Sequence, residues 1–223
     1  MIAHDATLEF TEADFRVRAA RGLLPAPADR LFDPRTGQAL GRSDWDLNKE
    51  LAADLAAMDP ARPAAVLVPI VLRTELTVLL TQRTDTLSSH AGQIAFPGGR
   101  IDGTDADAKA AALREAHEEI GLEPDHVEPL GYLDGYRTGT GYGITPLVAF
   151  VQPQFKLQLA PGEVAAAFEV PLRFLMTANN HLQQEREWRG RRRAFWAMPF
   201  GERYIWGATA GMLRNLFDRL YAS

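Results

Sequence analysis

Continuous apolar runs and alternating patterns along the chain predict a series of strands. The run from residue 64 to residue 73 is continuously apolar up to its final arginine, which is typical of a buried strand. A second strand is predicted at 76–83, after a turn marked by Glu75. Similar patterns predict strands at 94–96, 127–133, 144–151 and 164–170, and a hairpin over 186–198 that turns near Gly190.

Helical spacing of apolar residues marks the remaining elements. The clearest helix covers 205–220, and another covers 105–120, with Thr104 or Asp105 as its N-cap and Gly121 just beyond its end. Two more helices are predicted in the first quarter of the chain. One spans 46–58, and a shorter one starts near Thr11 with Phe15, Val17 and Ala20 on its apolar face.

The order of these elements predicts the fold class. Strands precede, follow and surround one central helix, and a second long helix closes the chain. This order indicates an α+β fold with α/β/α layers, in which a mixed sheet is packed between helices. Residues 1–62 are interpreted as a partly helical N-terminal extension, and residues 63–223 as the main domain.

Composition narrows the classes of function. The 223 residues include no cysteine, which excludes disulfides, thiolate metal sites and cysteine nucleophiles. The net charge of -5 argues against a general nucleic-acid binder. No apolar run approaches the length of a membrane span, and the N-terminus lacks the features of a signal peptide, so we expect a cytoplasmic protein without a membrane partner. Composition leaves the oligomeric state open.

Three carboxylates crowd one turn of the central helix. Glu115 lies three and four positions before Glu118 and Glu119, so all three are neighbours on one helical surface. Repulsion at this spacing costs about 0.2–0.5 kcal/mol per pair. A divalent cation such as Mg²⁺, which takes oxygen ligands, accounts for the arrangement. The alternative is a solvated acidic face in which Arg114 pairs with Glu118.

Two glycines just before this helix favour the metal hypothesis. Gly98 and Gly99 can adopt backbone angles that are closed to other residues. A sharp turn here brings a backbone carbonyl towards the carboxylate helix. An ordinary hairpin turn is the competing interpretation of the pair.

The stretch from Gly99 to Leu122 resembles the Nudix box, G-x5-E-x7-R-E-U-x-E-E-x-G-U, in which U is apolar. Every fixed position of its second half matches, from Arg114 through Gly121 to Leu122. The first half departs from the pattern. Gly99 is one residue further from Arg114 than the pattern gives, and the first glutamate falls on Asp105 or Ala106.

The residues before the box are similar to the signature of the coenzyme A pyrophosphatase branch, L-L-T-x-R-(S/A)-x3-R-x3-G-x3-F-P-G-G. Residues 79–99 supply the leucines, threonine, arginine and glycines of this signature, with Arg83 as its first cation. Ser88 stands where the signature has a second arginine. The resemblance covers about residues 64–220, and it implies a Nudix fold.

This resemblance implies a metal-dependent hydrolase with Mg²⁺ or Mn²⁺ as cofactor. Glu115 and Glu119 are the first choices as ligands, Glu118 is a third ligand or catalytic carboxylate, and the family adds the carbonyl of Gly98. Arg114 is expected to orient the box carboxylates.

The general base is less clearly marked by the sequence. Glu163 is the candidate, because similar proteins use a glutamate from a comparable loop. An exposed loop carboxylate is the alternative reading of Glu163, and Glu169 is a weaker candidate.

The same resemblance implies a nucleotide-like substrate. Arg83, Gly99, Arg100 and Tyr142 are the expected substrate contacts, with Arg137 and Tyr136 as weaker ones. Three further groups of residues are weaker candidates for binding the substrate. His90 is a phosphate contact or a solvated loop residue, His117 lies on the surface, and the arginines of 189–193 belong to a solvated hairpin.

Three functions are compatible with these residues. The first is cleavage of coenzyme A or acyl-CoA to 3′,5′-ADP and 4′-phosphopantetheine or its acyl derivative. The second is Nudix hydrolysis of ADP-ribose, NADH or a dinucleoside polyphosphate. The third is a catalytically silent Nudix-fold binding module, which the intact carboxylates of the box disfavour.

Overall fold

The computed structural model describes residues 9–28, 41–48, 61–85, 92–188 and 190–222. The helix predicted at 46–58 lies mostly outside these ranges. No helix in them is both long and apolar enough to cross a membrane. The helices are α1 (Glu12–Gly22), α3 (Ala108–Ile120), α4 (Leu172–Leu175) and α5 (Gly207–Leu220), with 3-10 turns at Pro124–His126 and Ala178–Asn180.

Two sheets are formed by the described residues. The large mixed sheet has the order β1-β7-β8-β2-β3-β4, and β5, β6 and β9 pair with β2, β8 and β3 respectively. The small antiparallel sheet has the order β10-β11-β12. The strands of the large sheet are β1 (Arg42–Ser43), β2 (Arg62–Val71), β3 (Thr77–Arg83), β4 (Ile94–Ala95), β5 (Gly98–Arg100), β6 (Val127–Tyr132), β7 (Tyr136–Arg137), β8 (Tyr142–Val151) and β9 (Val164–Pro171). Those of the small sheet are β10 (Leu182–Trp188), β11 (Arg191–Phe200) and β12 (Arg203–Trp206).

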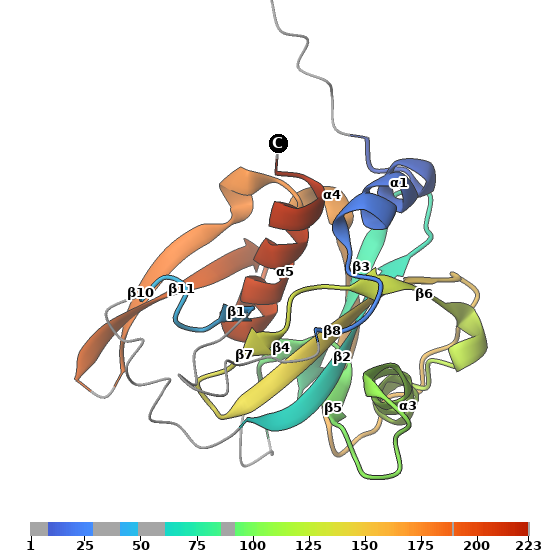
Figure 1. Ribbon diagram of the computed structural model, residues 1–223, viewed down its shortest axis with the longest axis horizontal. Helices are drawn as coiled ribbons and strands as arrows, with labels where there is room; N and C mark the ends of the chain where they lie inside the picture. The colour runs from blue at the N-terminus through green and yellow to red at the C-terminus, as the bar shows by residue number, and fades with distance from the viewer. Residues whose placement is uncertain (1–8, 29–40, 49–60, 86–91, 189, 223) are drawn as a thin grey trace, which may run out of the picture.

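Alternate residues of β2 serve two different cores, which explains its continuous apolar sequence. Ala65, Leu67 and Val71 face α3, where Ala111, Ala112 and Ala116 keep the helix close to the sheet. Val66, Val68 and Ile70 pack on the opposite side with residues of α1, α4 and α5. Figure 1 shows α3 on one side of the sheet and α1 and α5 on the other. The predicted α/β/α layering is therefore confirmed.

The N-terminal helix α1 is part of this packing. Thr11 caps it by accepting a hydrogen bond from the Asp14 backbone N–H. Phe15 and Ala19 are buried, whereas Val17 is 51% exposed and Ala20 is also exposed. The predicted apolar face was therefore wrong except at Phe15, because the buried pair is four residues apart and faces the sheet and α5.

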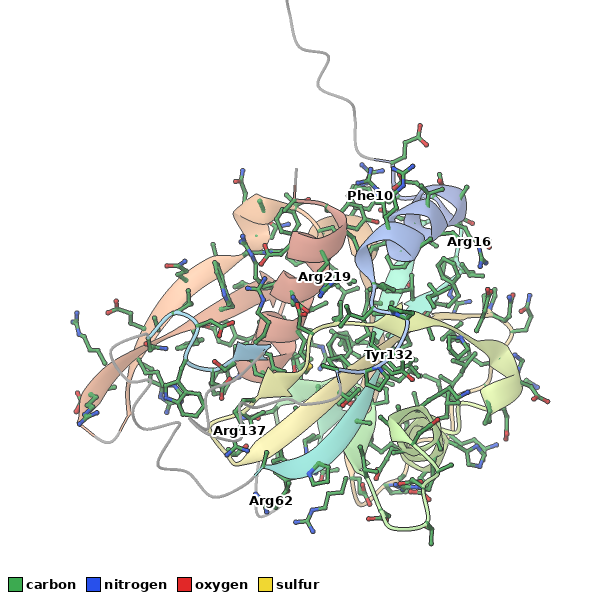
Figure 2. The ribbon with its side chains drawn as sticks, viewed as in Figure 1. Phe10, Arg16, Arg62, Tyr132, Arg137 and Arg219 are labelled. Atoms are coloured by element: carbon green, nitrogen blue, oxygen red, sulfur yellow. The ribbon has the colours of Figure 1, made fainter. Side chains whose placement is uncertain are left out.

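Ion pairs fasten α5 to the rest of the fold. Arg219 donates to both carboxylate oxygens of Asp134 at 2.6 and 2.9 Å, and Asn215 donates to the same carboxylate at 2.8 Å. Arg219 also donates to the carbonyl of Gly22 at the end of α1. Figure 2 shows Arg219 on α5 and Phe10 beside α1 toward the same end of the molecule, where Phe10 stacks on Tyr221 just after α5.

Two predicted boundaries needed correction, and one predicted turn is confirmed. Helix α3 begins at Ala108, because Asp107 caps it by accepting from the Ala110 N–H at 2.7 Å, and neither Thr104 nor Asp105 does so. Helix α5 begins at Gly207, because residues 203–206 pair with β11 as a third strand. The turn at Gly190, with a positive φ of 74°, agrees with the predicted hairpin.

Candidate active site

A tight backbone turn places two glycines against the carboxylates of α3. Gly98 has φ of +153°, and a Cβ atom there would lie 2.6 Å from the Cα of Val66. A Cβ on Gly99 would lie 2.5 Å from the carboxylate carbon of Glu115. Glycine is therefore required at Gly98 by the close approach of β5 to the backbone of β2, whereas a side chain at Gly99 would displace the Glu115 carboxylate. The turn predicted from the sequence exists and meets the carboxylate helix.

Glu119 is a buried carboxylate with few compensating partners. It is 4% exposed, and its Oε2 accepts the Gly98 backbone N–H at 3.1 Å. Its Oε1 lies 3.7 Å from Nη1 of Arg83. Burial raises the pKa of Glu119 to about 7, against the opposing effects of the Gly98 hydrogen bond and the Arg83 charge. A carboxylate in this setting is stabilised by an added positive charge.

Glu115 and Glu163 belong to the same electrostatic group. Burial raises the pKa of Glu115, and the charges of Glu118 and Glu163 act in the same direction. Glu163 also raises the pKa of Glu119. The loop that carries Glu163 is fixed to the end of β3, because the Thr84 N–H donates to the Glu163 carbonyl at 3.0 Å. The structure thus brings Glu163 to the box carboxylates.

Arg114 connects the loop before α3 to the helix. Its Nε and Nη2 each donate to Asp105 at 2.9 Å, and its Nη1 donates to Glu115 at 3.1 Å and to Glu118 at 2.9 Å. The paired hydrogen bonds from Arg114 lower the pKa of Asp105 to about 2. Asp105 therefore occupies the place of the missing first glutamate and orients Arg114, a role that its local sequence did not reveal.

Glu118 is more exposed than the other two carboxylates of the box. Its side chain is 56% exposed and is held by Arg114. Accordingly, no three acidic or histidine side chains within the described ranges are gathered as a preassembled metal site. The donor set still fits a hard divalent cation, since Glu115 and Glu119 are oxygen donors with raised pKa values that face the Gly98–Gly99 turn.

A cavity of about 660 Å³ opens beside this turn. The expected substrate contacts Arg83, Gly99, Arg100 and Tyr142 all line it. The buried Nε of Arg83 has no hydrogen-bond partner among the described residues, so its guanidinium can accept an anionic ligand.

Tyr142 lies at the rim of this cavity between two arginines. Arg62 stacks over its ring at 4.2 Å, and Arg100 donates a hydrogen bond to its hydroxyl, which raises the pKa of Arg100. Figure 2 shows Arg62 at the same end of the sheet as Arg137. The two arginines give this rim a positive charge.

Several weaker candidates have structural roles instead. Glu169 accepts from Arg73 at 2.7 Å and from Thr77 at 2.5 Å, and these bonds outweigh burial and lower its pKa. His117 is exposed, 3.5 Å from Glu123. Arg137 is 3% exposed and does not line the cavity. His90 and Ser88 lie outside the described residues.

Residues missed from the sequence lie on the far wall of the cavity. Arg193, assigned to a solvated hairpin, is only 17% exposed and lies 3.3 Å from Asp44. Asp44 also accepts the Tyr136 hydroxyl at 2.8 Å and the Gly139 N–H at 2.7 Å. These partners are separated by about ninety or more positions along the chain, so no local pattern could have predicted the cluster.

Comparisons with known proteins agree with the box assignment. The model of the NUDIX domain matches residues 61–195. The chain is 43% identical over 155 residues to the Nudix hydrolase NudL of Cronobacter sakazakii and to that of Escherichia coli K12, covering 70% of this chain and 81% of each relative. Among solved structures, the Nudix hydrolase RenU of M. smegmatis is 22% identical with a TM-score of 0.44, covering 52% of this chain and 74% of that one.

Proposed function

The chain belongs to the Nudix hydrolase family, and on this basis we propose that it hydrolyses the pyrophosphate bond of coenzyme A or acyl-CoA. The products are 3′,5′-ADP and 4′-phosphopantetheine or its acyl derivative. The reaction is attack of water on one phosphorus, with cleavage of the bond between that phosphorus and the bridging oxygen. Its barrier is lowered chiefly by stabilising charge on the phosphoryl oxygens.

The juxtaposition of Arg83 and Glu119 carries this proposal. Arg83 is the first cation of the coenzyme A signature, and Glu119 is a carboxylate of the box. They lie 3.7 Å apart. Arg83 lines the cavity, and its buried Nε has no hydrogen-bond partner among the described residues. A pyrophosphate bound here would contact Arg83 of the signature and, through the cation, the carboxylates of the box.

Mg²⁺ or Mn²⁺ would be held by Glu115 and Glu119, with the carbonyl of Gly98 as a further donor. Once bound, the cation supplies charge neutralisation and acidifies a coordinated water. Burial of the two carboxylates strengthens their attraction for a cation, because the surrounding dielectric constant is low. The turn at Gly98 and Gly99 fixes the position of these donors relative to α3.

Three further residues orient the machinery. The guanidinium of Arg114 donates hydrogen bonds to Glu115 and Glu118, and its hydrogen bond to Asp105 fixes its own position. Glu118 is 56% exposed beside Arg114 and would be a further oxygen donor for the cation. Glu163 is our candidate for the general base, because its loop is bonded to the end of β3 beside Arg83.

The substrate side of the site is assigned to Arg83, Gly99, Arg100 and Tyr142. Arg83 contacts the pyrophosphate, whereas Arg100 and Tyr142 lie together at the rim. Gly99 lines the cavity beside Glu115, where a side chain would displace that carboxylate. The partner is therefore a small nucleotide-like molecule.

A substrate panel tests this assignment. Purified protein is incubated with Mg²⁺ or Mn²⁺ and with coenzyme A, acetyl-CoA, ADP-ribose, NADH or diadenosine tetraphosphate, and the products are separated by chromatography. We expect kcat/KM for a coenzyme A species to exceed that for ADP-ribose by roughly tenfold or more, which corresponds to a difference of about 1.4 kcal/mol. Faster cleavage of ADP-ribose, NADH or the dinucleotide contradicts the substrate assignment, and no cleavage of any compound contradicts the enzyme assignment.

A further inference from the structure

The far wall of the cavity is built by one face of the small sheet. Arg186 and Arg193 are paired directly across β10 and β11, so their side chains project from the same face. Phe195 is two residues beyond Arg193 on that face, and Trp206 joins it through the pairing of β12 with Ala197. All four of these arginine and aromatic side chains line the cavity that contains Gly98 and Gly99.

Two arginines opposite each other in a β-ladder repel, and only one of them is neutralised. Like charges directly opposite in antiparallel strands are destabilising. Asp44 lies 3.3 Å from Arg193, and the ring of Trp45 lies under the same guanidinium at 4.9 Å. In the described part of the chain, no acidic side chain lies within ion-pair distance of Arg186. The pair therefore carries an excess positive charge into the cavity.

Asp44 cannot neutralise both arginines, because its two oxygens are already engaged. Oδ1 accepts the Tyr136 hydroxyl, and Oδ2 accepts the Gly139 N–H and faces Arg193. Asn48 fixes the same loop to β11 by exchanging two hydrogen bonds with the backbone of Ala194. This loop holds Arg193 in place, and the position beside Arg186 is left for an anion.

Aromatic surface stands next to the arginine pair. The rings of Phe195 and Trp206 contact edge to face, with centroids 5.4 Å apart and an interplanar angle of 63°. Both residues are only partly buried. An edge-to-face pair that lines a cavity offers an aromatic surface to a planar ligand.

We propose that this face binds a nucleoside that carries a phosphate monoester on its ribose. The base packs against Phe195 and Trp206, and the monoester lies beside Arg186 and Arg193. This inference rests on the proposed function, because it requires the scissile pyrophosphate at the Gly98–Gly99 end of the same cavity. An uncharged, non-aromatic chain such as pantetheine gains nothing from the arginine pair. We therefore assign the pantetheine to the side of the pyrophosphate that faces away from the small sheet.

Binding of the two product halves tests the inference without turnover. Isothermal titration of the full chain with adenosine 3′,5′-bisphosphate, AMP and 4′-phosphopantetheine is performed at one fixed salt concentration. The wild type is expected to bind the bisphosphate roughly tenfold or more tightly than AMP, since charge-assisted hydrogen bonds to the additional phosphate are made. Equal affinity for the bisphosphate and AMP, or preference for 4′-phosphopantetheine, overturns the inference.

A matched pair of variants locates the effect. Arg186→Gln removes the unneutralised charge, while Arg192→Gln removes an equal charge from the same hairpin, where the side chain is 86% exposed and pairs with Glu185. We expect Arg186→Gln to abolish the preference for the bisphosphate and Arg192→Gln to preserve it. Equal losses in both variants indicate general electrostatic attraction and overturn the assigned site.

Kinetics separate this inference from the proposed function. If coenzyme A is cleaved, the ratio of kcat/KM for coenzyme A to that for dephospho-coenzyme A should fall in Arg186→Gln and not in Arg192→Gln. An unchanged ratio overturns the pocket assignment while leaving coenzyme A hydrolysis intact. If coenzyme A is not cleaved but the bisphosphate preference is present and depends on Arg186, the pocket assignment stands and the proposed substrate does not.

Discussion

Two regions of this molecule treat partly or fully buried carboxylates in opposite ways. At the seam between α5 and the large sheet, Asp134 receives hydrogen bonds from Arg219 and Asn215, and these partners lower its pKa. At the cavity, Glu119 has one backbone N–H and a guanidinium at 3.7 Å, and burial raises its pKa to about 7. Asp134 is thus compensated inside the protein, whereas Glu119 is not.

We propose that this difference separates a structural carboxylate from a functional one. A buried charge that is fully paired can serve stability, but it has little remaining attraction for a ligand. A buried negative charge with few hydrogen-bond or ion-pair partners destabilises the folded protein without a ligand, and it attracts a cation. The same contrast holds for arginines, since Arg219 is fully engaged and Arg83 retains a buried Nε without a partner.

Glu119→Gln is the substitution with the largest expected effect on activity. Removing this oxygen donor should lower kcat by roughly 10²–10³-fold, which is the size of effect seen when one preorganised electrostatic group is lost. The protein should remain folded, because glutamine keeps the volume and can accept the Gly98 N–H. Steady-state kinetics with thermal denaturation check both points. Activity close to wild type would remove Glu119 from the site.

Arg83→Gln tests the second member of the cavity group. Loss of a charge-assisted contact to phosphate should reduce kcat/KM by about 10–100-fold. Arg73→Gln is a suitable control, because Arg73 makes its ion pair with Glu169 and does not line the cavity. Equal reductions in the two variants would show that Arg83 acts only through the stability of the fold.

Asp134→Asn tests the compensated region. We expect a loss of about 1–2 kcal/mol in the free energy of unfolding at pH 7, with little change in kcat/KM. The pKa of Asp134 is lowered in the folded state, so its stabilising effect is present above the unfolded pKa and is lost as the pH falls through the folded pKa. The difference between wild type and variant should therefore shrink in acid. Urea titrations at neutral and acidic pH measure it, and a constant difference contradicts the ion-pair account.

Val17→Ser is expected to have the smallest effect. Val17 is 51% exposed on α1, so its loss should change the free energy of unfolding by less than about 0.5 kcal/mol. Phe15→Ala on the same helix is the contrasting variant, because Phe15 is fully buried and its truncation should cost about 3–5 kcal/mol. Comparable losses from both variants would contradict the observed orientation of α1.

Local patterns in the sequence were sufficient for much of the fold. The apolar run of β2 predicted a buried strand, and the spacing of Glu115 and Glu119 placed them on one helical surface. The glycines at 98 and 99 predicted the turn that meets this helix. Each of these inferences depends on residues within a few positions of one another, where backbone geometry fixes the distance.

Contacts between distant segments could not be predicted in this way. Asp105 meets Arg114 only because the loop before α3 folds back on the helix. Arg83 and Glu119 lie 36 positions apart, and Arg193 and Asp44 lie 149 positions apart along the chain. The contact of Glu118 with Arg114 also depends on distant segments, because the packing of α3 against the turn determines which side of the helix meets the turn.

The central claim is that the undercompensated carboxylates at the cavity are completed by a divalent cation. The most direct test is the change in the melting temperature on adding Mn²⁺ to chelator-treated wild type, Glu119→Gln and Asp134→Asn. A ligand that binds only the folded state raises its stability. We predict a clear rise for wild type and Asp134→Asn and a much smaller one for Glu119→Gln. An equal rise in all three proteins would contradict the claim.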